Sequence, residues 1–312
     1  MRLFSYRDDS GQDLSPQLPA GLAAFLDGDE TQASQRWLLP GIRLGRLLPD
    51  GDVETIPRRA PTPIAGLTAA PAIPWPGKIV CIGHNYRGHI TEQGIEPPDR
   101  PLLFAKFANA VLADGEPIVR PTGSHALDLE AELGVVIGRA ARRVSAGQAM
   151  EHVLGYVVVN DISARDWQGT KAALRPGERG DGQWLRAKGS DTFFPIGPVL
   201  VTADEFDGPP DLPIRSWRIP GAGPSAGQPI LMQDSRTGDL LFGIPELIEF
   251  VSRSITLEPG DIISTGTPAG VGVFREPPIF LEPGDRVRVE IEGIGSVENP
   301  VVEWADDPRD PT

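Results

Sequence analysis

The amino-acid sequence predicts a β-rich protein of the α+β class. Most of its apolar stretches are short, which is typical of strands rather than helices. The 36 glycines and 33 prolines are spread along all 312 residues instead of being concentrated in one place. Such punctuation indicates many turns between short strands. Only a few segments carry apolar residues at helical spacing, so we expect few helices.

The first 75 residues differ from the rest and are predicted to form a small N-terminal α/β domain. Residues 1–6 and 41–56 are typical of strands, the second with an Asp-Gly turn inside it. A helix is expected around 22–38, between the two strands. The proline-rich tract that follows predicts a linker at about 57–77. Residues 76–312 would then form the main domain.

From residue 78 onward, strands are expected to dominate the chain. Two helices are also predicted. The segment 145–153 opens with Ser145 and Gln148 in a capping-box pattern, and the segment 244–256 places apolar residues along one helical face. The expected strands, in order, are 78–83, 102–107, 127–138, 154–161, 195–201, 214–219, 229–234, 261–266 and 286–295.

Three carboxylates in apolar surroundings predict a site for a hard divalent cation. If 127–138 is a continuous strand, Glu130 and Glu132 lie on one side of it and the apolar residues on the other. Asp161 closes the next apolar run. Two buried like charges repel each other, so Mg²⁺ or Mn²⁺, which prefer oxygen ligands, would suit the space between them. A Glu-x-Glu pair alone is more often a solvated strand edge, and Asp161 is what favours a metal site.

A histidine and a glutamate in the segment 83–94 suggest a general base. A short helix capped by Asn85 would place His89 and Glu92 on one face at positions i and i+3. A carboxylate beside an imidazole orients the ring and raises its basicity. The glycines of this segment disfavour a permanent helix, as a mobile lid would require. The alternative is a surface pair on a loop helix.

Four further residues are candidates for contact with a substrate. Arg165 could hold a carboxylate in a bidentate clamp, and Gln168 could hydrogen-bond a carbonyl oxygen. Lys188 could pair with the metal carboxylates or with an enolate, and Thr267 could donate to a carboxylate. The alternatives are a salt bridge from Arg165 to Asp161 or Asp166 and an exposed Lys188.

Composition excludes some classes of partner. The formal net charge of −14 argues against nucleic-acid binding, which needs a basic surface. No apolar run approaches the length of a membrane span, and the first residues do not look like a signal peptide. The single cysteine fits a reducing compartment. We therefore expect a cytoplasmic enzyme that binds neither nucleic acid nor membrane.

Taken in order, these motifs resemble the fumarylacetoacetate hydrolase superfamily, in its branch of acylpyruvate hydrolases and 2-hydroxyhepta-2,4-diene-1,7-dioate isomerases. The resemblance spans about 78–303. It implies a mixed β-roll catalytic domain over 76–312, a smaller N-terminal domain and a homodimer. The matching stretches are IGHNYRGHITE, LDLEAELGVVIG, NDISARDWQ, GQWLRAKGSDTFFPIGP and ITLEPGDIISTGTPAGVG.

The resemblance also implies a role for each candidate residue. The Mg²⁺ or Mn²⁺ ligands would be Glu130, Glu132 and Asp161; the catalytic residues His89, Glu92 and Lys188; and the substrate contacts Arg165, Gln168 and Thr267. Two departures from the family pattern bear on the substrate. His84 stands where relatives commonly carry Leu or Lys, and Gly189-Ser190 replaces a pair that ends in an aromatic residue. We therefore expect the pocket to lack one aromatic wall.

Residues and resemblance together suggest hydrolysis of a C–C bond in a 2,4-dioxo acid such as an acylpyruvate or fumarylpyruvate. The acid would chelate the cation, which would stabilise an enolate, while His89 would activate water. The alternatives are isomerisation of a 2-oxo-3-ene diacid and decarboxylation of an oxaloacetate-type acid. A fourth alternative, from another class, is a metal-stabilised binding protein without turnover.

Overall fold

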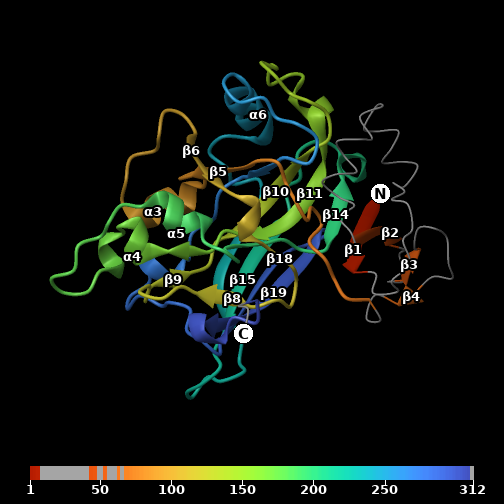
Figure 1. Ribbon diagram of the computed structural model, residues 1–312. Helices are drawn as coiled ribbons and strands as arrows, with labels where there is room; N and C mark the ends of the chain where they lie inside the picture. Colours follow the sequence, from red (N-terminus) through yellow and green to blue (C-terminus); the bar gives the residue numbers. More distant parts are fainter. Residues whose placement is uncertain (8–41, 48–51, 55–61, 64–66, 310–312) are drawn as a thin grey trace.

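A computed structural model describes residues 1–7, 42–47, 52–54, 62–63 and 67–309 and confirms the α+β, β-rich prediction (Figure 1). The largest sheet of this part of the chain has ten strands. In spatial order they are β4 (Thr62–Pro63), β3 (Asp52–Glu54), β2 (Ile42–Leu47), β1 (Arg2–Arg7), β14 (Val199–Thr202), β11 (Val153–Asn160), β10 (Ala131–Ile137), β17 (Ile262–Ser264), β5 (Ile79–Gly83) and β6 (Leu102–Lys106). The pairing is antiparallel except between β17 and β5.

A second sheet of five strands packs near the first, and two short pairs complete the strand structure. The five strands are, in spatial order, β16 (Ile230–Arg236), β15 (Pro213–Ile219), β18 (Arg286–Ile291), β19 (Gly295–Glu303) and β8 (Ile118–Arg120). The two pairs are β12 (Ser163–Ala164) with β9 (Leu127–Asp128), and β13 (Phe194–Pro195) with β7 (Val111–Leu112). Since β8 runs parallel to β19, both large sheets are mixed.

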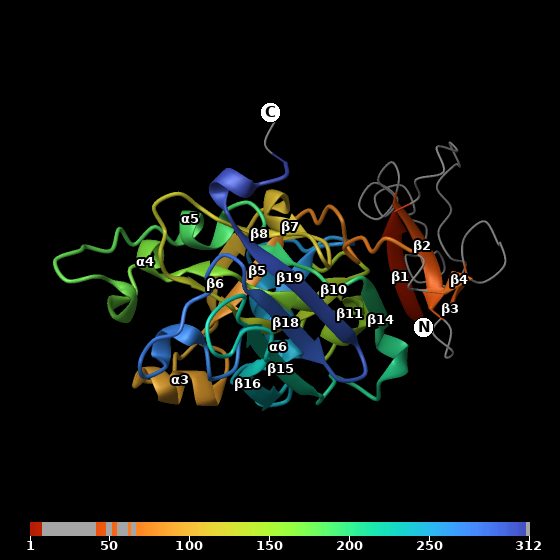
Figure 2. The same cartoon turned by 90° about the horizontal axis from the view of Figure 1, so that it is seen from below.

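The described helices are short, and three of them gather at one end of the molecule. Both views place α3 (Arg87–Gln93), α4 (Arg165–Gln168) and α5 (Trp184–Gly189) on the side opposite β1 to β4 (Figures 1 and 2). The remaining α-helix among the described residues is α6 (Ile244–Ser252). The 3₁₀ helices are η2 (Ala108–Ala110), η3 (Ala149–His152), η4 (Lys171–Ala173), η5 (Ala203–Glu205), η6 (Gly272–Phe274) and η7 (Trp304–Asp306).

The central strands of the ten-stranded sheet are buried on both faces. On β10, Val135 packs in the core shared with α6 and the five-stranded sheet, whereas its neighbour Val136 packs in the other main core. On β11, Val158 and Val159 divide in the same way. Burial on both sides explains why these strands are apolar at consecutive positions instead of alternating. Their ends can therefore present polar groups inside the protein.

Most predicted elements are confirmed in whole or in part, but one predicted helix is wrong. The predicted strands from 78 onward are all present in whole or in part, and α6 lies within the predicted helix 244–256. The segment 145–153 forms only η3, although Ser145 does hydrogen-bond Gln148. The predicted α-helix is therefore wrong: the tight turn closed by this contact leaves room for a single 3₁₀ turn before β11 begins.

The N-terminal strands belong to the same sheet as the rest of the chain. β1 pairs with both β2 and β14, with Leu3 opposite Leu200. The predicted strands 1–6 and 41–56 are thus confirmed where they are described, the second as β2 and β3. The helix expected around 22–38 and part of the 57–77 linker lie outside the described residues, and the domain division at residue 75 stays a prediction. No described helix is long and apolar enough to cross a membrane.

Gly155 allows β11 to approach β14. A Cβ atom at this position would lie 2.2 Å from the carbonyl oxygen of Val201, which is far inside van der Waals contact. We predict that Gly155→Ala lowers the free energy of unfolding by about 3 kcal/mol, because backbone must move to admit the methyl group. Urea denaturation measures the change. Gly147→Ala is the matched control, since a Cβ there meets nothing within 4 Å; an equal, small effect of both changes would contradict the prediction.

Candidate active site

Three buried carboxylates converge where β10 and β11 meet. Glu132 lies on β10, Glu130 just before it, and Asp161 directly after β11. The Asp161 amide donates to the Glu130 carbonyl at 2.9 Å, which holds the two segments together. One oxygen from each carboxylate lies within 4.8 Å of the others. None of the three side chains is more than slightly exposed, so the arrangement is not a solvated strand edge.

The predicted continuous strand 127–138 is wrong, because the chain breaks between β9 and β10. The amide of Glu130 donates to the Asn160 side chain at 3.0 Å, and the amide of Ala131 donates to the Gln233 side chain at 2.9 Å. Side chains thus take backbone donors that a regular ladder would use. Leu129 consequently packs in a different core from Ala131, and the two glutamates converge without lying on one strand face.

Two of the three carboxylates are paired with buried cations. Lys188 Nζ lies 2.7 Å from Glu130 Oε2 and 3.0 Å from Asp161 Oδ2. Arg165 lies 2.6 Å from Glu130 Oε1 and 2.9 Å from Asp128 Oδ2. The alternative partners of Arg165, Asp161 and Asp166, are thus not the ones found, which are Asp128 and Glu130. The alternative of an exposed Lys188 is also wrong, because this lysine is buried.

Lys106 was not singled out from the sequence, yet it is a central member of the cluster. Its Nζ lies 2.7 Å from Asp161 Oδ1 and donates to the carbonyls of Ile162, Lys188 and Phe193. The side chain is 1% exposed. A lysine inside the apolar strand LLFAKF was the available signal, because a charge rarely enters such a strand without a partner.

The electrostatics of the cluster leave one carboxylate without a matching cation. Burial raises the pKa of Glu130, but Lys188 and Arg165 outweigh it and hold that pKa at about 2. Burial raises the pKa of Glu132 well above its ordinary value, and Asp161 and Glu130 raise it further. Glu132 accepts from neutral donors, Ser264 Oγ at 2.5 Å and the Gly266 amide at 3.0 Å. The three carboxylates offer only oxygen ligands, and the donors that contact Glu132 carry no positive charge. A divalent cation such as Mg²⁺ or Mn²⁺ fits both features.

His89 and Glu92 form an oriented pair at the edge of the cluster. The Nδ1 of His89 lies 2.5 Å from Glu92 Oε1, and Glu92 Oε2 accepts from the Gly270 amide at 2.8 Å. An ionised carboxylate at Nδ1 keeps the proton there, so Nε2 carries the free lone pair. Glu92 therefore joins α3 to the glycine-rich stretch 264–272. Whether α3 opens as a lid stays a prediction.

Asn85 is not the N-cap of this helix, contrary to expectation. Tyr86 occupies the cap position and makes no side-chain capping bond. The Asn85 side chain instead donates to the carbonyls of Phe242 and Thr265 and accepts from the Phe242 amide. It is fully buried, and it fixes the start of α3 against the two loops that border the site.

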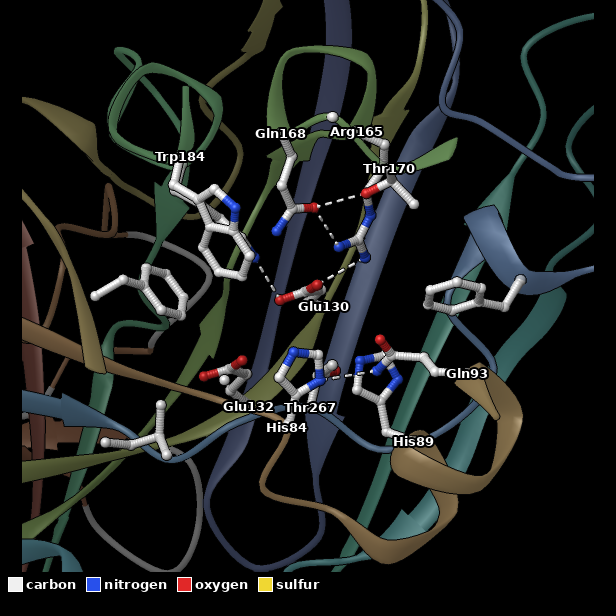
Figure 3. Close-up of a pocket in the computed structure, with 16 residues that line it drawn as sticks. His84, His89, Gln93, Glu130, Glu132, Arg165, Gln168, Thr170, Trp184 and Thr267 are labelled. Carbon is white, nitrogen blue, oxygen red and sulfur yellow. Dashed lines mark hydrogen bonds and ion pairs between the residues drawn. The ribbon is translucent and has the colours of Figure 1, made fainter. Parts of the chain in front are cut away.

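A cavity of about 240 Å³ collects most of the predicted residues (Figure 3). Gln168 Oε1 accepts from Arg165 and Thr170, which leaves its amide group toward the cavity. The Thr267 hydroxyl donates to the Ala131 carbonyl and accepts from Gln233, so its proton is already used. Of the predicted residues, the cavity is lined by His89, Glu130, Glu132, Arg165, Gln168, Lys188 and Thr267; Glu92 and Asp161 contact lining residues from behind.

The expected loss of an aromatic wall is wrong. Gly189 and Ser190 line a different cavity, of about 410 Å³, and not the one with the carboxylates. The end of α5 turns these residues away from the site, while Trp184 at its start faces it. Trp184 packs edge to face on Phe104 with ring centres 5.6 Å apart, and both rings line the first cavity.

Comparison with known proteins agrees with this geometry. Residues 78–302 match the family model described as fumarylacetoacetate (FAA) hydrolase C-terminal. Oxaloacetate tautomerase fahd2, mitochondrial, of Xenopus laevis is 45% identical over 227 residues, or 73% of this chain and 66% of the relative, just under two thirds of its length. Oxaloacetate tautomerase FAHD2B, mitochondrial, of Bos taurus is 42% identical over 287 residues, or 92% of this chain and 81% of the relative.

A solved structure supports the same relationship. The 5-carboxymethyl-2-hydroxymuconate delta-isomerase of Mycobacterium smegmatis superposes with a TM-score of 0.68 at 38% identity, covering 85% of this chain and 95% of that one. Because two of the relatives named above are mitochondrial, the cytoplasmic location expected from the sequence stays a prediction.

Lys106 can be tested as a structural cation of the site. We predict that Lys106→Met lowers the free energy of unfolding by about 3–5 kcal/mol, because Asp161 Oδ1 and three carbonyls lose their charged donor and Asp161 keeps only Lys188, at Oδ2. Urea denaturation of the metal-free protein measures the loss. Lys171→Met, at an exposed lysine, is the control and should have little effect. A Lys106→Met protein as stable as the control would show that Lys106 does not balance the cluster.

Proposed function

The chain belongs to the fumarylacetoacetate hydrolase family, whose members are metal-dependent enzymes, and on this premise we propose that it interconverts the keto and enol forms of a 2-oxo diacid, with oxaloacetate as the first candidate. The observation that carries the proposal is the placement of His89 and the carboxylate cluster around one cavity. A 2-oxo acid held at the cluster would have an imidazole beside its C3 carbon. The names of the relatives favour oxaloacetate as the acid.

Glu130, Glu132 and Asp161 would hold the cation, and Mg²⁺ or Mn²⁺ suits their oxygen atoms. When bound, such a cation supplies Lewis-acid polarisation of the 2-oxo carbonyl. Lys188 lines the same cavity and adds a positive charge of the protein to it. In the metal-free protein the opposite charges on Asp161 and Glu130 outweigh the burial of Lys188 and raise its pKa, so this lysine is a positive charge beside the two carboxylates.

His89 is the proton carrier of the proposed reaction. Its Nε2 takes a proton from C3 of the keto acid, the electrons of the C3–H bond form the C2=C3 double bond, and the π electrons of the C2=O bond move to the 2-oxo oxygen. That oxygen takes up a proton from solvent to give the enol, and Nε2 releases its proton to solvent. The reverse reaction returns the C3 proton from Nε2. Glu92 holds the proton on Nδ1 and stabilises the charged ring that forms in between.

Hydrolysis of a C–C bond in a 2,4-dioxo acid is the second candidate. The same Nε2 could take a proton from a water molecule instead of from C3, and the pair of His89 with Glu92 suits both tasks. Isomerisation of a 2-oxo-3-ene diacid, decarboxylation of oxaloacetate and metal-stabilised binding without turnover use the same cation site. The homodimer implied by the family resemblance also stays a proposal.

The candidates are separated by their products. We expect the Mg²⁺-loaded or Mn²⁺-loaded protein to accelerate the decay of enol-oxaloacetate absorbance without release of CO₂, and chelation of the metal to abolish the acceleration. Proton NMR of acetylpyruvate, oxaloacetate and a hydroxymuconate-type diacid then identifies every product. Formation of acetate and pyruvate from acetylpyruvate, with no effect on enol-oxaloacetate, would replace tautomerisation by hydrolysis.

The role of His89 has its own test. His89→Ala should lower kcat by about 10²- to 10⁴-fold, because general acid–base catalysis contributes this much. Metal content should stay normal, since His89 does not belong to the group of three residues that would hold the cation. His152→Gln, at a histidine outside the cavity, is the control and should leave kcat unchanged. Full activity of the His89→Ala protein with normal metal content would remove His89 from the mechanism.

A further inference from the structure

A second histidine, His84, faces the same cavity. It follows β5 directly, and its ring lies nearly parallel to that of His89, with ring centres 6.4 Å apart. The backbone of His84 is left-handed, with φ of 54°. This conformation costs free energy in any residue except glycine, although histidine tolerates it better than most. Glycine would adopt this backbone conformation at a lower cost in free energy than histidine does.

The hydrogen bond made by His84 fixes which ring nitrogen carries the proton. Gln93 Nε2 lies 3.1 Å from His84 Nδ1. An amide nitrogen can only donate, so Nδ1 accepts and the proton of the neutral ring is on Nε2. Figure 3 shows this second nitrogen turned toward Glu130 and the cavity, away from Gln93. His84 therefore offers an N–H donor, whereas His89 offers a lone pair.

The arginine and the lysine that line the cavity are already paired with carboxylates of the protein. Arg165 is paired with Asp128 and Glu130, and Lys188 with Glu130 and Asp161. No described residue accepts a hydrogen bond from His84 Nε2. The ring is half-buried and lines the cavity, so solvent can accept from Nε2–H when the cavity is open. A ligand that fills the cavity displaces this solvent and must replace it as the acceptor.

We propose that His84 is a specificity-determining residue whose Nε2–H donates to the second carboxylate of a 2-oxo diacid. The inference rests on the proposed function and names its substrate class. If C3 lies at His89 Nε2, the C4 carboxylate is one bond away, and the neighbouring parallel ring of His84 is placed to reach it. A 2-oxo monoacid such as pyruvate has no group at that point. The site would therefore select diacids over monoacids.

The test measures how the change His84→Gly affects the binding of a diacid, oxaloacetate, and of a monoacid, pyruvate. His84→Gly removes the donor and also relieves the left-handed backbone, so its Tm should equal or exceed that of the wild type. With Mn²⁺ bound, calorimetric titration should show about 10-fold weaker binding of oxaloacetate, as expected for a lost hydrogen bond to a charged group, and unchanged binding of pyruvate. The Kd for Mn²⁺ itself should differ from that of the wild type by no more than about 2-fold, which is far below the tenfold change that about 1.4 kcal/mol produces. His152→Gln is the control.

Each outcome decides between the inference and the function on which it rests. Equally weakened binding of both acids, or unchanged binding of both, overturns the role of His84. The role is also overturned if ¹⁵N NMR spectra of the metal-free protein show the proton of the His84 ring on Nδ1. Discrimination by the wild type that is lost in His84→Gly supports the inference even if oxaloacetate is not turned over, in which case the tautomerase proposal alone fails. Wild-type protein that binds neither acid contradicts both.

Discussion

The need to balance buried negative charge governs the arrangement of the site. Four carboxylates, those of Asp128, Glu130, Glu132 and Asp161, lie within the protein beside three buried cations. Isolated charges cannot remain buried, so each must be paired. The pairing reaches every carboxylate except Glu132. We propose that a divalent cation would complete the cluster at this place, where a 2-oxo acid would also meet the protein.

The fold makes such a cluster possible by covering both faces of its central strands. β10 and β11 end inside the molecule, and the break before Ala131 turns Glu130 toward Asp161. Three short helices then bring the remaining groups to the same end of the sheet (Figure 2). α3 carries His89 and is joined to the glycine-rich stretch through Glu92, while α5 carries Lys188. Positioning by strands and buried bonds favours a rigid site.

Local patterns in the sequence predicted much of this and missed what depends on tertiary contacts. Strands could be predicted because their apolar runs are short and bounded by turns, and the three carboxylates stood out inside apolar runs. The break at Glu130 could not, since it depends on the side chains of Asn160 and Gln233, which are distant in sequence. The place of Lys106 depends in the same way on three carbonyls from two distant segments. The direction in which Gly189 points depends on where α5 ends.

The central claim is that the carboxylate cluster holds a divalent cation, and calorimetric titration of the metal-free protein with Mn²⁺ tests it most directly. The account predicts one tight site in the wild type and at least about 10-fold weaker binding in Glu132→Gln, which keeps the shape of the side chain and removes its charge. Glu151→Gln, at an exposed glutamate, should bind like the wild type. A wild type that binds no divalent cation, or a Glu132→Gln protein that binds Mn²⁺ as tightly as the wild type, would contradict it.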